Sequence, residues 1–184
     1  MKTKIVSFYC DVGKSTFYSD CAKRMIARCK KLGLSYYIKE RNYGKTWIDN
    51  VRAKPVFLLE TFKELREPFL WVDIDCDIMQ PIPSIDKLNC DLASAPKHGK
   101  SMIIHDAVHY VGTSQVTLKL LKLWKRRCTT NPVGGSHRIL NRIIVRKEVP
   151  NLRFKFLSDT LIKGPKIKIG ISLEESKSNY FKKR

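Results

Sequence analysis

The chain has 184 residues, of which 43% are hydrophobic and 10% aromatic, enough for one domain with a substantial core. Lys and Arg number 36 against 17 acidic residues, and the formal net charge of +19 implies an anionic partner: nucleic acid, a phosphorylated substrate or an anionic membrane surface. We expect neither a membrane span nor a signal peptide, because the sequence lacks both patterns. The cysteines are far apart and lack zinc-ligand spacing, which argues against a structural zinc site and favours the buried thiols of a cytoplasmic, intracellular protein.

Hydrophobic periodicity predicts strands that alternate with helices, which is typical of an α/β fold. Strands are expected at residues 4–10, 34–39, 69–72, 91–95, 152–157 and 166–171, with one or two more between 102 and 111. Helices are expected from Ser15 or Ser19 to Gly33, from Lys54-Pro55 onward, at 114–128, and at 136–146 with Ser136 as the cap. The start at Lys54-Pro55 is predicted because the first turn of a helix tolerates proline. No repeat or linker divides the chain, so we expect one domain at 1–176 and a basic tail at 177–184.

The segment GKST at 13–16 is similar to part of a phosphate-binding P-loop. That motif needs a glycine five residues before Gly13, and Phe8 occupies that position. We therefore reject a P-loop at this turn.

An apolar run that ends in acidic residues, PFLWVDIDCDIMQPI at 68–82, is the most informative segment of the chain. Its uninterrupted apolar residues predict a central strand that is buried on both faces. If the strand geometry continues, Asp73, Asp75 and Asp77 project from one face at the carboxyl end of the strand, where they repel one another. A cation such as Mg²⁺ or Mn²⁺ would relieve the repulsion. Alternatively, some of these acids cap the following turn or pair with lysines.

The segment from residue 53 to 82 resembles the corresponding part of glycosyltransferases of the GT-A fold, which use nucleotide-diphosphate sugars. In both, a lysine-bearing helix precedes an apolar strand that ends in a D-x-D motif, and the pattern is most similar to that of glycogenin-type and capsule-type enzymes. The segments VHYVGTSQVTLKLLKLW at 108–124 and FLSDTL at 156–161 are also similar to elements of that family. The resemblance implies a single-domain, GT-A-like and Rossmann-related fold, with a mixed, mostly parallel sheet flanked by helices.

The resemblance also implies roles for individual residues. Asp73 and Asp75 would be the D-x-D pair that holds Mn²⁺ or Mg²⁺ on the diphosphate, and Asp77 would be an additional acid. Lys54 would approach the sugar nucleotide, which would be a UDP- or GDP-sugar. Tyr9, at the end of the first predicted strand, either stacks on the nucleotide base or belongs to the core.

The identity of a catalytic base stays open at this stage. An inverting transfer needs a general base for the acceptor hydroxyl, and the candidates are His137, Asp106 and Asp159. We hypothesise that His137 assists the acceptor, because it titrates near neutral pH and lies at a predicted helix start. The family pattern differs at two places: Ser136-His137 stands where Asp-Gln is common, and the segment 164–172 lacks the late histidine that commonly completes the metal site. The other histidines have no role that their spacing indicates.

Two functions of different classes remain open. One is a metal-dependent glycosyltransferase with an unidentified glycan, protein or lipid acceptor. The other is a basic nucleic-acid-binding protein, or a nuclease that uses the same carboxylates and metal. Against the second, Phe69, Trp71 and Trp124 lie in apolar runs and do not alternate with basic residues as a stacking platform requires. The tail residues YFKKR at 180–184 are either a peripheral contact with an anionic membrane or acceptor, or a solvated end.

Overall fold

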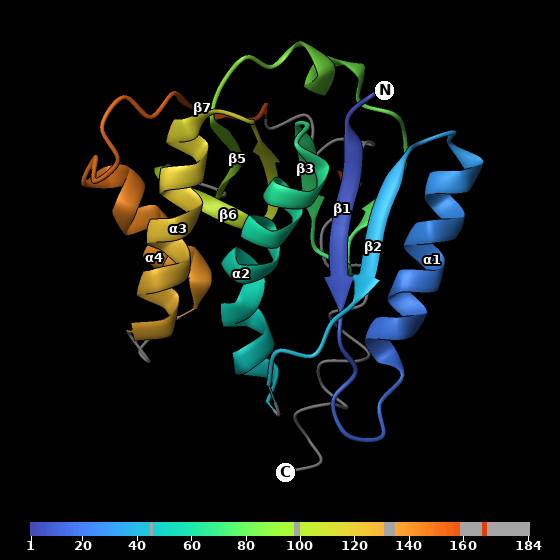
Figure 1. Cartoon of the computed structure of the whole chain (residues 1–184). Coiled ribbons are helices and arrows are strands. Elements are labelled where there is room, and N and C mark those ends of the chain that lie inside the picture. Colours follow the sequence, from blue (N-terminus) through green and yellow to red (C-terminus); the bar gives the residue numbers. More distant parts are fainter. Residues whose placement is uncertain (45, 98–99, 131–134, 159–166, 169–184) are drawn as a thin grey trace.

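The computed structural model (Figure 1) describes the chain except residues 45, 98–99, 131–134, 159–166 and 169–184. The predicted tail at 177–184 therefore lies outside the described residues. In chain order the elements are β1 (Lys4–Tyr9), α1 (Phe17–Lys31), β2 (Tyr36–Glu40), α2 (Trp47–Leu65), β3 (Phe69–Val72), β4 (Asp77–Ile78), the 3-10 helix η1 (Pro83–Lys87), β5 (Leu92–Lys97), β6 (Lys100–Val111), α3 (Gln115–Thr130), α4 (Ser136–Val145), β7 (Phe154–Phe156) and β8 (Ile167–Lys168).

The main sheet has six strands in the order β2-β1-β3-β6-β5-β7. β1 is parallel to β2 and β3, and β5 is parallel to β7, whereas β6 is antiparallel to its neighbours β3 and β5. The prediction of a mixed, mostly parallel sheet flanked by helices is confirmed. Because β1 and β3 run in the same direction, their carboxyl ends meet at one edge of the sheet, the lower edge in Figure 1.

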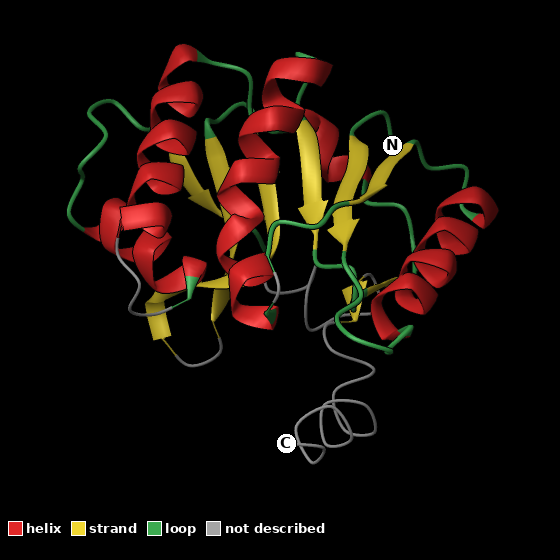
Figure 2. Cartoon of the chain, turned by 60° about the horizontal axis from the view of Figure 1, so that its bottom comes forward, coloured by secondary structure: helices red, strands yellow, loops and turns green. Residues whose placement is uncertain are grey.

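The central strand β3 is buried on both faces because its side chains enter two different cores. Leu70 and Val72 belong to the core that α1 covers, whereas Phe69 and Trp71 belong to the core shared with α2, α3 and α4. None of the four side chains is more than 2% exposed. Figure 2 shows α2, α3 and α4 grouped on one side of the sheet. The prediction of a central, doubly buried strand is confirmed.

The helix α2 begins at Trp47, earlier than the predicted start at Lys54. A capping box fixes this start: the Asp49 N–H donates to Thr46 Oγ1 at 3.2 Å, and the Thr46 N–H donates to Asp49 Oδ2 at 3.0 Å. Pro55 therefore lies inside the helix, where it cannot donate one backbone hydrogen bond. The predicted start is wrong because the capping box and the buried side of the helix outweigh that single loss.

The helix α4 and the last strand also differ from the prediction. Gly135 is the cap of α4 and Ser136 is its first residue. The Ser136 hydroxyl donates to Asp106 Oδ2 at 2.8 Å, whereas the hydroxyl of a capping serine accepts from a backbone N–H of the first turn. The strand predicted at 166–171 is described only at β8, which pairs with β4 in a separate two-stranded sheet. The remainder of that predicted strand lies outside the described residues.

All six cysteines are free and buried, as predicted. Burial raises the pKa of the Cys29 thiol to about 11 and that of the Cys128 thiol to about 12. These thiols are therefore in the protonated, weakly nucleophilic form near neutral pH. Within the described part of the chain, no helix combines the length and the apolar character that crossing a membrane requires.

Candidate active site

A pocket of about 510 Å³ lies at the carboxyl edge of the main sheet. Its lining comes from the end of β1 and the loop after it, the start of α1, the first half of α2, β3 and the residues after it, one residue of β6 and the start of α4. Residues far apart in sequence meet here because the neighbouring strands β1 and β3 both end at this edge. The pocket brings together six of the residues selected from the sequence, namely Tyr9, Lys54, Asp73, Asp75, Asp106 and His137. Asp159 lies outside the described residues, so the structure leaves its role a prediction.

Asp77 is separated from the other two acids of the segment. β3 ends at Val72, and the Cys76 N–H donates to the Asp73 carbonyl at 2.9 Å, which closes a turn. Asp77 then begins β4, where its carboxylate lies 3.2 Å from Arg24 Nε of α1 and outside the pocket lining. The expectation that all three acids project from one face is wrong, because the alternation of side chains ends with the strand. Among the described residues, no group of three or more Asp, Glu, His or Cys side chains could hold a metal ion.

Lys54 of α2 joins two carboxylates at the floor of the pocket. Its ammonium nitrogen lies 2.8 Å from Asp73 Oδ1 and 2.9 Å from Asp106 Oδ2, and it donates to the Asp106 carbonyl at 2.7 Å. The three N–H donors of the ammonium thus have three protein acceptors. The ammonium also lies 5.2 Å from the centre of the Trp71 ring, whose Nε1 donates to Asp73 Oδ1 at 2.9 Å. Asp73 is therefore neutralised by a lysine of a different element, which local sequence did not reveal.

Asp106 is held by two further side chains. Its Oδ1 lies 3.0 Å from His109 Nε2, and the Ser136 hydroxyl donates to its Oδ2 at 2.8 Å. His109 is itself buried, with Nδ1 2.8 Å from Ser94 Oγ and its ring edge-on to Trp124. A continuous chain of polar contacts therefore runs from β5 through β6 to the pocket floor. His109 is a core histidine with both ring nitrogens satisfied.

Ser94, His109 and Asp106 are the residue types of a hydrolase triad, but their surroundings exclude that role. Ser94 is 0% exposed and does not line the pocket. A substrate carbonyl must reach the serine hydroxyl for nucleophilic catalysis, and the complete burial of Ser94 prevents this. The three residues therefore support the pocket and do not form a second catalytic centre.

The charges of this network move two pKa values in opposite directions. Burial alone would lower the pKa of the Lys54 ammonium, but Asp106 and Asp73 outweigh burial and hold the pKa above its ordinary value. Burial alone would raise the pKa of Asp106, but Lys54 and His109 outweigh burial and hold the pKa below its ordinary value. A carboxylate that binds a proton so weakly is a poor general base. The geometry therefore favours a positioning role for Asp106.

The two sides of the pocket differ in chemistry. On the β1 side the lining includes the aromatic residues Phe8, Tyr9 and Tyr18, whereas the start of α4 contributes His137 and Arg138. The acids that follow β3 lie between these sides, because β3 separates β1 from β6 in the sheet and α4 packs on β6. The sequence-based selection missed Tyr18 and Arg138, since both fit ordinary helix positions. The Tyr18 N–H donates to Asp11 Oδ1 at 2.8 Å, across the turn that precedes α1.

Comparisons with known proteins bear on the fold. The sequence matches no protein-family model and no curated protein. The structure is similar to that of a glycosyltransferase involved in the glycosylation of the major capsid of PBCV-1, with a TM-score of 0.62 and 17% identity over 86% of this chain and 82% of that chain. This chain has a glycosyltransferase fold.

Two further glycosyltransferases are similar to this chain. GlyE of Streptococcus pneumoniae TIGR4 gives a TM-score of 0.58 at 14% identity, covering 97% of this chain and 50% of GlyE. The bifunctional glycosyltransferase WbbM gives a TM-score of 0.53 at 9% identity, covering 85% of this chain and 38% of WbbM. The chain thus spans half or less of these two proteins. At such identities the similarity establishes the fold, and it does not favour the nucleic-acid-binding alternative.

Proposed function

We propose that this protein is a metal-dependent glycosyltransferase that moves a sugar from a nucleotide-diphosphate sugar to an acceptor. The observation that carries the proposal is the convergence of Asp73, Asp75 and His137 in one pocket at the carboxyl edge of a glycosyltransferase fold. Ligands of α/β proteins bind at this edge, and an acidic centre beside aromatic side chains suits a nucleotide whose diphosphate meets a cation.

Asp73 and Asp75 are the residues that would hold Mn²⁺ or Mg²⁺. Two carboxylates are sufficient, because Mg²⁺ is commonly bound by one or two carboxylates together with substrate phosphates and waters. The Lys54 ammonium, 2.8 Å from Asp73 Oδ1, opposes the approach of a second cation to this carboxylate, although its single charge is shared with Asp106. We therefore expect weak cation binding until the diphosphate supplies further oxygen atoms. When bound, the cation supplies Lewis-acid stabilisation of the charge that develops on the leaving diphosphate.

Lys54 is proposed to act through Asp73. Its ammonium and the Trp71 indole both bind Asp73 Oδ1, which leaves Oδ2 available to a ligand in the pocket. The same ammonium is held from below by Asp106. This arrangement differs from the direct contact with the sugar nucleotide that the family resemblance implies. It fixes the rotamer of Asp73, so that the carboxylate is oriented before the donor arrives.

The remaining roles follow the division of the pocket. Tyr9 and Tyr18 offer ring faces and hydroxyls on the side where the nucleotide base would lie. His137, at the start of α4, is the proposed base for the acceptor hydroxyl in an inverting transfer. Asp106 is less suited to that role because Lys54 and His109 hold its pKa low.

Calorimetric titration with UDP or GDP, with and without Mn²⁺, tests this proposal. Asp75→Asn keeps the size of the side chain but removes a charged ligand, so the gain in nucleotide affinity from Mn²⁺ should fall by at least about tenfold. Asp77→Asn is the matched control, because Asp77 belongs to the same segment but pairs with Arg24 outside the pocket. The same Mn²⁺-dependent affinity in wild type and Asp75→Asn would refute the metal assignment. Nucleotide binding by neither protein, together with salt-sensitive binding of DNA, would favour the nucleic-acid alternative.

A further inference from the structure

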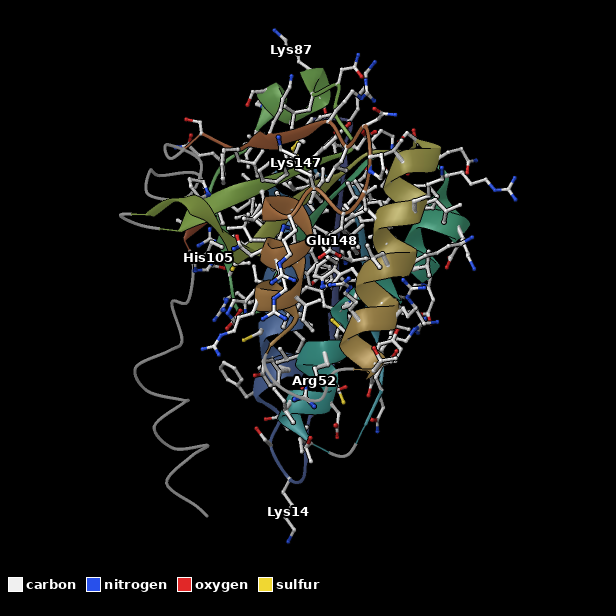
Figure 3. All side chains as sticks on the ribbon, turned by 90° about the vertical axis from the view of Figure 1, so that its left-hand side faces the viewer. Lys14, Arg52, Lys87, His105, Lys147 and Glu148 are labelled. Atoms are coloured by element: carbon white, nitrogen blue, oxygen red, sulfur yellow. The ribbon has the colours of Figure 1, made fainter. Side chains whose placement is uncertain are left out.

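The segment from residue 107 to 147 carries a large uncompensated positive charge. It contains no Asp or Glu, and its cationic residues are Lys119, Lys122, Lys125, Arg126, Arg127, Arg138, Arg142, Arg146 and Lys147. The segment forms α3 and α4, which pack against each other and face the viewer in Figure 3, where Lys147 is labelled beyond the end of α4. This segment therefore contributes +9 to the formal net charge of +19.

Two arginines of α4 and the arginine that caps its C-terminus form a continuous stripe along the exposed side of the helix. Arg138, Arg142 and Arg146 follow one another at intervals of four residues, which places them on the same side of a helix and about 6 Å apart along its axis. The opposite side of α4 is buried in the core. Val145, which is 49% exposed, lies on the same side as the arginines. We call Arg138, Arg142 and Arg146 the arginine stripe.

The arginine stripe has no carboxylate partner among the described residues. The nearby Arg127 of α3, in contrast, pairs with Glu148 at 2.6 Å. Three guanidinium groups at this spacing repel one another, and an anionic surface would relieve the repulsion. The stripe also begins at the pocket, because Arg138 is one of the lining residues. An anionic surface that binds the stripe would therefore lie beside the pocket.

We propose that the arginine stripe docks this protein on an anionic phospholipid surface, so that the pocket faces an acceptor held at that surface. The link to the acceptor rests on the proposed glycosyltransferase function, whereas the docking itself does not. Val145 favours lipid over nucleic acid, because a lipid interface accommodates an apolar side chain among cations. α4 has no Phe, Tyr or Trp residue on which a base could stack. A helix that presents three arginines and one valine suits a layer of phosphate headgroups.

Vesicle sedimentation tests the docking surface. Wild type is expected to bind phosphatidylcholine vesicles that contain phosphatidylglycerol and not vesicles of phosphatidylcholine alone. Each cation near an anionic leaflet raises binding about fivefold, so the double variant Arg142→Gln/Arg146→Gln should bind roughly 25-fold more weakly. Lys30→Gln/Lys31→Gln is the matched control, because it removes the same charge from exposed positions of α1, which covers the other face of the sheet. Circular dichroism of both variants checks that they are folded.

The outcomes separate this proposal from its competitors. Absence of vesicle binding by wild type, or an equal loss in the two double variants, overturns the docking surface. Tighter binding to single-stranded or duplex oligonucleotides than to vesicles, with the same dependence on Arg142 and Arg146, assigns the stripe to nucleic acid instead. If truncation after residue 176 removes all vesicle binding while the arginine variant retains it, the tail is the contact and the stripe is not. Calorimetry with UDP in the absence of lipid tests the proposed function independently.

Discussion

Replacing Lys54 by methionine removes the charge that joins two carboxylates while keeping an unbranched side chain. In the wild type Lys54 is 5% exposed, and its ammonium lies 2.7 to 2.9 Å from three oxygen atoms of Asp73 and Asp106. The variant leaves both carboxylates at the pocket floor without their cation. It also leaves the Asp106 carbonyl without the lysine donor.

The expected loss of stability follows from the burial of these partners. Removing one partner of a buried ion pair costs about 3–5 kcal/mol, because the remaining charge is left buried and uncompensated. The side chain of Asp73 is 31% exposed, so water screens its charge, whereas that of Asp106 is 15% exposed but keeps its contacts with His109 and Ser136. We therefore expect the lower end of the range, a decrease of about 3 kcal/mol in the free energy of unfolding near neutral pH.

The loss should shrink as the pH falls. In the wild type the lowered pKa of Asp106 contributes stability above the ordinary carboxyl pKa of 3.8, and this contribution is lost as the pH falls toward the folded-state pKa. Without Lys54, burial raises the pKa of Asp106 and the contact with His109 still lowers it, so this pKa lies higher in the variant than in the wild type. Asp106 of the variant can then be protonated in the folded state, so wild type and variant should differ less at about pH 4 than at neutral pH.

Urea unfolding, followed by tryptophan fluorescence at both pH values, measures these differences. The control is Lys23→Met on α1, which removes an exposed lysine 2.9 Å from Asp20 and should leave stability close to that of the wild type. The double variant Lys54→Met/Asp106→Asn removes one of the two orphaned charges and should recover part of the loss. A Lys54→Met variant within about 1 kcal/mol of wild type, or with the same loss at both pH values, would refute a buried charged network.

Three further predictions concern other parts of the molecule. His137→Ala should slow sugar transfer and leave the affinity for UDP, measured by calorimetry, unchanged. If His137→Ala keeps the turnover of the wild type while Asp159→Asn abolishes activity, the role of general base moves to Asp159. Burial lowers the pKa of His105 from its ordinary value of 6.5, so this side chain binds a proton more readily in the unfolded chain than in the folded one. The free energy of unfolding should therefore rise with pH through the range just below 6.5. Urea titrations of His105→Gln should show a smaller rise over the same range. The buried cysteines should react slowly with a thiol reagent in the native protein and rapidly in urea, and fast labelling of the native protein would contradict their burial.

Much of the fold follows from local sequence. An apolar run without a polar position, as at Phe69 to Val72, can be satisfied only where both faces are covered, and the structure places it in two cores. The start of α2 was also present in the sequence, because Thr46 and Asp49 have the spacing of a capping box. The helix start was predicted at Lys54 because Pro55 also indicates the first turn of a helix, although the capping box was present in the sequence. Periodicity and caps act over a few residues, which is why sequence alone determined most helices and strands.

Only the tertiary structure determined which partner or position each acidic residue has. Asp73, Asp75 and Asp77 alternate in the same segment and are equivalent by sequence pattern. In the folded chain Asp73 meets Lys54, Asp77 meets Arg24, and Asp75 lines the pocket. Each ion pair joins residues from elements distant in the chain, and its strength depends on separation through space and on burial. Sequence spacing contains neither quantity, so the alternation alone predicted an acidic site, and the choice of Asp73 and Asp75 as its pair came from the family resemblance.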